Sequence, residues 1–102
     1  ANAAVMNLTR EQYQEWTNLG REIQKRLEAA VQGGLSPEGE AGKEITGLHR
    51  RWLTITGNRY DPVRHRGIAE LYVMDERFVA YYDKRLSGCA RFLRDAVAHW
   101  AS

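Results

Sequence analysis

The spacing of apolar residues constrains this chain most, because they recur every three or four positions through most of the sequence. That period places apolar side chains on one face of an α-helix. No window of useful length alternates apolar and polar residues with period two, and no Asn-Gly or Asp-Gly pair marks a hairpin turn. The sequence therefore predicts an all-α fold.

Start and stop signals divide this pattern into about five helices. The capping box TREQ at 9–12 predicts the start of the first helix, and the glycine pair at 33–34 predicts its end. Pro37 and Pro62 mark two further starts, because proline is favoured at the first helical position. The residues expected to cap the later helices are Ser36, Asp61, Asp75 and Ser87, with a short fourth helix over 76–83.

Short loops between helices of unequal length favour a compact helical pack over a symmetric bundle. The third predicted helix carries Val63, Ile68, Leu71 and Tyr72 as its apolar residues. In the short helix that follows, Phe78 is expected to face the core.

A chain of 102 residues is long enough for one domain. Residues 1–8 are expected to form a flexible end and residues 9–102 the domain. The single cysteine, Cys89, cannot form an internal disulfide and fits a reducing compartment, so a cytoplasmic location is expected. No apolar run approaches the roughly 20 residues of a membrane span, and the first residues do not read as a signal peptide. Because the chain begins with Ala1, it is interpreted as part of a longer protein.

Arginine is concentrated in one stretch of the chain. The arginines between His49 and Arg66 are Arg50, Arg51, Arg59 and Arg64, and the one acid there is Asp61. Such a run can bind phosphate groups. However, no recognition helix places it in a DNA groove. A solvated face, or a surface that docks on another part of a regulator, is the preferred interpretation.

A candidate ligand site combines apolar rings with a few polar groups. Ligand pockets have that mixture of lining. Trp52, Tyr60, His65 and Tyr72 can supply it, and His49 lies on the same helical face as Trp52. Packing of the same rings in the core is the alternative.

No catalytic set emerges from the sequence, so an enzyme is not expected. The serines at 36 and 87 read as helix caps. Haem requires an axial ligand in a deep apolar pocket. Arginines flank His49 and His65, which argues against that role. No metal or other cofactor is expected.

Several stretches resemble the TipAS-type antibiotic-recognition domain, the effector-binding part of some MerR-family transcriptional activators. In chain order they are LTREQYQEW, HRRWLTI, RYDPVRHRGIAELYVMDERFVAYYD and SGCARFLRDAVAHW, and together they cover nearly everything from Thr9 onward. The DERF sequence at 75–78 is the most telling part.

The resemblance implies a globin-like pack without haem and a cleft for bulky apolar antibiotics such as thiopeptides. In full-length members an N-terminal winged helix-turn-helix binds DNA and a coiled coil makes a homodimer, so this fragment alone is expected to be a monomer. Some members carry a cysteine, just before the stretch that matches ELY, that bonds covalently to the ligand. Gly67 stands there in this chain, so covalent capture is not expected, although Gly67 is retained as a candidate site position.

The preferred function is therefore ligand sensing by a transcriptional regulator that binds no membrane. A drug-sequestering resistance protein that acts by binding alone is the alternative. A haem or gas sensor is a more distant one.

Overall fold

The computed structural model describes residues 8–102, and all regular structure in this range is helical, as predicted. The helices are α2 (Arg10–Gln32), α3 (Glu40–Leu53), α4 (Pro62–Met74), α5 (Glu76–Tyr82) and α6 (Cys89–Trp100). The expected flexible end at 1–8 lies almost entirely outside the described residues.

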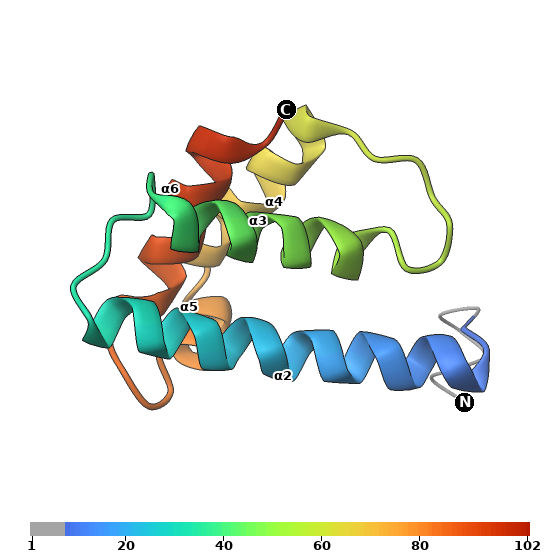
Figure 1. Ribbon diagram of the computed structural model, residues 1–102, viewed down its shortest axis with the longest axis horizontal. Coiled ribbons are helices and arrows are strands. Elements are labelled where there is room, and N and C mark those ends of the chain that lie inside the picture. The colour runs from blue at the N-terminus through green and yellow to red at the C-terminus, as the bar shows by residue number, and fades with distance from the viewer. Residues whose placement is uncertain (1–7) are drawn as a thin grey trace.

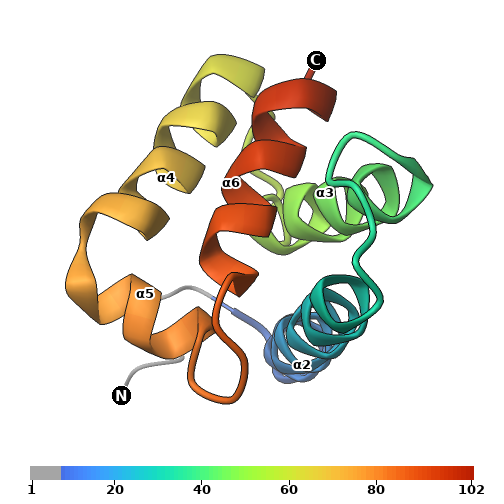
Figure 2. The ribbon, with the colours of Figure 1, turned by 90° about the vertical axis from the view of Figure 1, so that its left-hand side faces the viewer.

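The helices form two antiparallel pairs that pack against each other. α2 and α3 run side by side in opposite directions (Figure 1), and α4 and α6 form the second pair (Figure 2). α5 is a short helix that follows α4 and closes one end of this second pair. Helix α6 lies at the centre, where it contacts each of the other four helices.

The core surrounds α6 because that helix has small and medium apolar residues on its inner face. Leu93, Ala96 and Val97 are completely buried, and Leu27 and Ile45 reach them from the α2–α3 pair. Small side chains on a central helix let its neighbours approach closely, which permits dense packing in a domain of this size.

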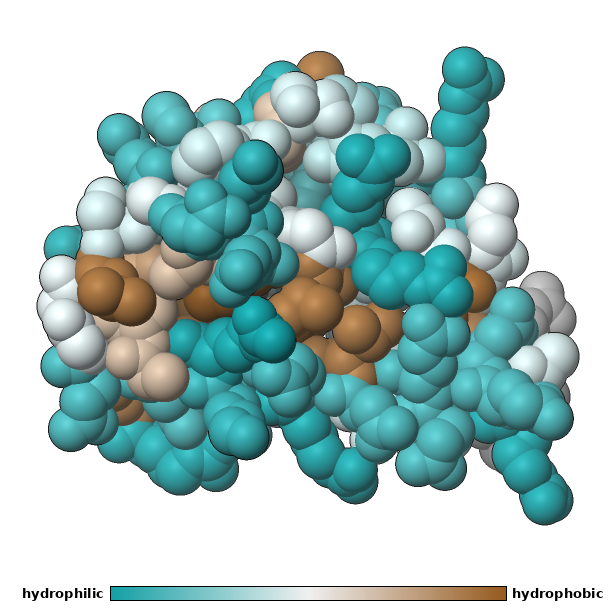
Figure 3. Space-filling view, in the orientation of Figure 1, coloured by the Kyte–Doolittle hydropathy of each residue, from teal (hydrophilic) through white to brown (hydrophobic). Residues whose placement is uncertain are grey.

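Apolar side chains pack along the seam between α2 and α3, and pairs of charged side chains lie over them at the surface. Figure 3 shows apolar side chains along this seam, partly covered by hydrophilic ones. Arg26 lies 3.3 Å from Glu44, and Arg51 lies 2.8 Å from Glu15, so ion pairs join the two helices at both ends of the seam. No helix among the described residues is long and apolar enough to span a membrane.

The predicted start of the first helix is confirmed in detail. The Thr9 hydroxyl accepts a hydrogen bond from the Gln12 amide, and the Gln12 side chain accepts one from the Thr9 amide, both at 3.0 Å. The Gln12 amide group also donates to the carbonyl of Ile55 at 3.2 Å. This contact ties the start of α2 to the loop that precedes α4.

The expected start of the second helix at Ser36 is wrong. The Ser36 hydroxyl accepts from the Glu38 amide within a turn, and α3 begins only at Glu40 with Gly39 as its N-cap. The turn packs on α3 itself: a Cβ at Gly42 would lie 1.7 Å from the Pro37 carbonyl oxygen. The indole of Trp100 donates to that same carbonyl at 3.2 Å, which fixes the turn against α6.

The expected Ser87 cap is also wrong. α6 begins at Cys89, and Gly88 at its N-cap has a φ of 102°, a left-handed conformation that glycine adopts without strain. The Asp83 carboxylate accepts from the amides of Gly88 at 3.1 Å and Ala90 at 2.9 Å. Asp83 therefore supplies the capping group from outside the helix.

One face of α4 and part of α5 depart from the predicted core. Val63 and Leu71 point to solvent, and Phe78 is 37% exposed although it was expected to face inward. The buried face of α4 is instead formed by His65, Ala69 and Tyr72. Two buried polar rings on this face therefore occupy positions that apolar residues would be expected to fill.

Candidate functional site

Five of the six predicted site residues lie together between α3 and α4. α3 contributes His49 and Trp52 from one face, and α4 contributes His65 and Tyr72, which are two turns apart. The loop between the helices contributes Tyr60. The sixth position, Gly67, lies elsewhere on the exposed side of α4, where a Cβ would meet nothing within 4 Å.

The polar atoms of four of these side chains form one continuous chain of hydrogen bonds. Tyr60 Oη lies 2.8 Å from His65 Nδ1, and His65 Nε2 lies 2.8 Å from His49 Nδ1. His49 Nε2 in turn lies 3.1 Å from Tyr72 Oη. Both imidazole rings thus use both nitrogens, and neutral rings satisfy the chain in either direction because a hydroxyl can donate or accept.

The histidines are held in their neutral form. His49 is fully buried and His65 is 1% exposed. Burial, together with the nearby His65 ring, lowers the pKa of His49 from 6.5 to about 3. Burial, reinforced by the positive charges of Arg50 and Arg66, lowers the pKa of His65 to about 4.

Stacked rings connect this buried network to the surface. The His49 ring stacks on His65 at 5.0 Å between centroids and on Trp52 at 5.5 Å, and Trp52 stacks on Trp16 at 5.1 Å with the planes 17° apart. Tyr13, which is 45% exposed, extends the series at 6.2 Å from Trp16. We call these five rings, Tyr13, Trp16, Trp52, His49 and His65, the aromatic column.

Trp16 belongs to the column but was not among the candidate site residues selected from the sequence. Trp16 is only half-buried, and its ring covers one side of Trp52. Gly20, one turn after Trp16, lies next to the Trp52 indole: a Cβ there would lie 3.7 Å from the indole nitrogen, an ordinary contact distance.

The edge of Tyr72 joins a second aromatic group from α5. Its ring meets His49 edge-on at 5.5 Å and lies 5.0 Å from Phe78 and 4.9 Å from Tyr82. Burial raises the pKa of Tyr72 and Tyr82, so both hydroxyls remain protonated hydrogen-bonding groups. Phe78 thus packs against the Tyr72 ring although more than a third of its own surface is exposed.

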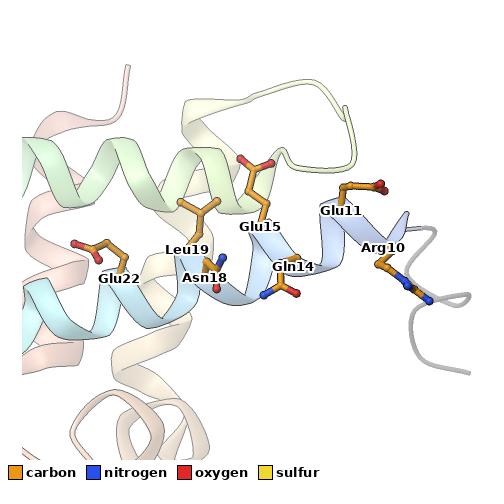
Figure 4. Close-up of a pocket in the computed structure, with 7 residues that line it drawn as sticks. All are labelled: Arg10, Glu11, Gln14, Glu15, Asn18, Leu19 and Glu22. Atoms are coloured by element: carbon orange, nitrogen blue, oxygen red, sulfur yellow. The ribbon is translucent and has the colours of Figure 1, made fainter.

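Two hollows lie near the column. A small cavity of about 30 Å³ lies against Tyr60 and His65, with Asn58, Arg59 and Asp61 among its polar lining. This volume is enough for a water molecule. An open depression of about 660 Å³ lies on the N-terminal half of α2 (Figure 4), and all of its lining residues except Leu19 are charged or polar. None of the predicted site residues lines that depression.

Most of the arginine-rich stretch has structural partners. The Arg50 guanidinium lies 3.9 Å from the centroid of the Tyr60 ring, and Arg66 donates to the carbonyl of Ala101 at 2.9 Å. Arg51 pairs with Glu15 across the helix seam. These contacts favour the interpretation of this stretch as a structural surface.

Within residues 8–102, no group of three or more histidine, cysteine or acidic side chains is placed to hold a metal ion. The partly exposed rings of the column can bind a partner by stacking, whereas both nitrogens of each imidazole are already used within the hydrogen-bonded chain. A column that begins at a partly exposed ring and ends at buried polar groups is suited to a ligand with flat apolar parts.

This all-helical domain, with its aromatic, hydrogen-bonding site, belongs to the TipAS antibiotic-recognition domain family, whose sequence profile matches residues 1–100. Its relatives include the HTH-type transcriptional activators TipA of Streptomyces coelicolor and Streptomyces lividans. Each is 31% identical over 91 residues, which cover 87% of this chain. The match spans 35% of either relative, so the chain corresponds to about a third of their length. A comparison with solved structures gave no match. The resemblance inferred from the sequence is confirmed, and the family is one of ligand-recognition domains within regulators.

Proposed function

We propose that this domain senses a bulky, largely apolar ligand with flat ring systems, of the thiopeptide kind or another large aromatic antibiotic, and transmits its binding to a transcriptional regulator. The observation that supports this most directly is the aromatic column. Stacked aromatic faces gain additional stabilisation from a further ring at 4.5–7 Å, a contact that requires no particular functional group on the ligand.

The ligand would contact the accessible rings and leave the buried network in place. Tyr13 is 45% exposed and Trp16 is half-buried, so these rings can take additional contacts. Both faces of Trp52 are covered, one by Trp16 and one by His49, so a ligand would reach Trp52 at its edge. His49 and His65 lie deeper, where they hold the Trp52 ring from behind and provide no free nitrogen. Their role would be to fix the orientation of the aromatic surface, which lowers the entropy cost of binding.

Tyr60 would couple the site to the loop between α3 and α4. Its hydroxyl is bound to His65 and its ring lies under Arg50, while the loop is also held by the contact from Gln12 to Ile55. A ligand that favours one arrangement of this loop shifts the population of states. Coupling to a distant site requires that the two arrangements bind the ligand with different affinity.

The rest of the regulator would lie outside this chain. TipA is an HTH-type transcriptional activator, and by analogy a longer form of this protein would bind DNA through a separate domain, as a homodimer in the cytoplasm. The present residues would then serve as the effector-binding part.

Calorimetric titration of the folded domain with a panel of thiopeptides and other large aromatic antibiotics tests the proposal. A ligand found in this way should bind the Trp52→Leu variant at least ten times more weakly, because buried tryptophans at binding sites commonly contribute 2 kcal/mol or more. Trp100→Phe is the matched control, since Trp100 lies at the end of α6 and bonds to Pro37. Equal affinity for the folded Trp52→Leu variant and the wild type would show that the column is not the site.

A second candidate function is sequestration of a drug by binding alone. The column supports it equally well, since a sequestering protein needs only affinity. A reporter gene under the control of the regulator's own promoter separates the two: sensing requires ligand-dependent transcription, whereas sequestration protects cells without it.

A further inference from the structure

The chain of hydrogen bonds from Tyr60 to Tyr72 connects two different parts of the domain. Tyr60 lies in the loop between α3 and α4 and is only partly buried. Tyr72 is buried near the end of α4, and the Tyr82 ring of α5 packs on it at 4.9 Å between centroids. The buried rings of His65 and His49 supply the links between these two ends. A polar path thus runs from a surface loop to the junction of α4 with α5.

The central bond of this path forces the two histidines to change together. His65 Nε2 lies 2.8 Å from His49 Nδ1, and a neutral imidazole carries its one N–H proton on either of its two nitrogens. If both facing nitrogens carried a proton, two donors would meet, and if neither did, two lone pairs would face each other. One of them must therefore donate to the other. The rings are consequently either both protonated at Nε2 or both protonated at Nδ1.

We propose that the path is a two-state device that couples the α3–α4 loop to the junction of α4 with α5. In one state every donor points from Tyr60 towards Tyr72, and both histidines are protonated at Nε2. In the other state every donor points from Tyr72 towards Tyr60, and both histidines are protonated at Nδ1. Each ring is neutral and each hydroxyl keeps its proton in both states. The change from the first state to the second takes one proton from water at the Tyr60 hydroxyl and releases one at the Tyr72 hydroxyl.

The two states differ in what each end offers to its surroundings. When Tyr60 donates to His65, its hydroxyl can only accept from another group, while the Tyr72 proton is free to donate elsewhere. In the second state these roles are exchanged. The small cavity beside Tyr60 has room for a water molecule and is lined by both an acid, Asp61, and a base, Arg59. A group that accepts or donates at the loop therefore favours one state and changes the hydrogen bonding at Tyr72, which it does not touch. The use of this coupling by a bound ligand rests on the proposed sensing function, whereas the coupling itself does not.

Nitrogen NMR of the domain with isotope-labelled histidine tests the proposal at neutral pH, because protonated and bare imidazole nitrogens have well separated chemical shifts. Tyr72→Phe leaves His49 Nε2 without a partner, and a buried N–H without an acceptor is costly. Both rings should then be protonated at Nδ1 by a ratio of about ten to one or more. Tyr60→Phe leaves His65 Nδ1 without a partner and should give the opposite result, with both rings protonated at Nε2. In each variant the decisive ring is the one that the replaced tyrosine does not touch.

Tyr81→Phe is the matched control, because it removes the same hydroxyl from an exposed ring of α5 that lies outside the path. Its histidine spectrum should equal that of the wild type, in which the two rings should show the same ratio of tautomers. The same His65 tautomer in Tyr72→Phe and in Tyr60→Phe would overturn the proposal. So would unequal ratios in the two rings of the wild type, a result that requires no variant to fold. No ligand is present in these measurements, so their outcome is separate from that of the calorimetric test of sensing.

Discussion

Acid should destabilise this domain well above the pH at which carboxylates titrate, because folding keeps two histidines neutral. In the folded state the pKa is about 3 for His49 and about 4 for His65, compared with 6.5 in the unfolded chain. Between the unfolded and the folded pKa values of each histidine, the unfolded chain binds more protons than the folded one. The free energy of unfolding therefore falls as the pH falls through this range. The stability conferred by the neutral rings is fully present above pH 6.5 and is lost progressively down to about pH 4 for His65 and about pH 3 for His49.

The size of this loss of stability follows from the same pKa values. At pH 5 an unfolded histidine is almost fully protonated while both folded rings remain neutral, which costs about 2 kcal/mol per histidine relative to pH 7. For the pair, the loss is up to about 4 kcal/mol, a large part of the 5–15 kcal/mol that stabilises an ordinary domain. Hydrogen bonds to Arg51 and Arg26 lower the pKa of Glu15 and Glu22, but from an ordinary value of 4.5, so those groups act mainly below pH 5.

Urea unfolding at pH 7, 6 and 5, followed by tryptophan fluorescence, measures this loss. His65→Gln should halve the fall in the free energy of unfolding between pH 7 and pH 5, because unfolding then leads to the uptake of one proton by these two positions and not two. His99→Gln is the comparison variant, since His99 lies on the exposed side of α6, outside the buried hydrogen-bonded chain. A free energy of unfolding that is constant from pH 7 to pH 5, or an unchanged slope in His65→Gln, would refute the assignment of neutral buried histidines.

Three further predictions concern the helix ends and the buried thiol. Gly42→Ala should lower the free energy of unfolding by about 2 kcal/mol or more, because the added methyl group meets backbone. Gly47→Ala, in open space on the same helix, should raise it by about 0.5–1 kcal/mol in the same denaturation assay. Asp83→Ala should cost about 1–2 kcal/mol because two amides at the start of α6 lose their acceptor, whereas Ser87→Ala should change stability by less than about 0.5 kcal/mol; equal effects would contradict the capping assignment. Cys89 should react with a thiol reagent at pH 8 only after denaturation, because burial, together with the Asp83 and Glu28 carboxylates, raises its pKa to about 11; rapid reaction of the native protein would contradict this.

The sequence predicted the helices best where local chemistry is sufficient. The capping box at Thr9 and the caps at Asp61 and Asp75 all form as expected, because each involves atoms only two or three residues apart. The predictions at Ser36 and Ser87 failed for the opposite reason. There the turn is decided by contacts from Trp100 and Asp83, which lie outside the local segment.

In the candidate site, too, the sequence predicted the features that depend on residue type and spacing but not those that depend on contacts between distant segments. Residue type and helical spacing were enough to select His49, Trp52, Tyr60, His65 and Tyr72 as a group with polar and aromatic character. Their use as one buried hydrogen-bonded chain could not be predicted, because the two bonded histidine nitrogens belong to residues 16 positions apart in different helices. Neither histidine has a neighbour in the sequence that indicates how its polar atoms are satisfied.

The sequence by itself thus determined that this chain is helical, where most of its helices begin, and which family it belongs to. The tertiary structure decided which face of each helix is buried. In α4, apolar residues occupy both sides, and only the packing of α6 and α5 selects the face with His65 and Tyr72 for the interior while Leu71 and Met74 remain outside. The physical reason is that helix caps depend on nearby atoms, whereas burial depends on which surfaces of distant segments meet.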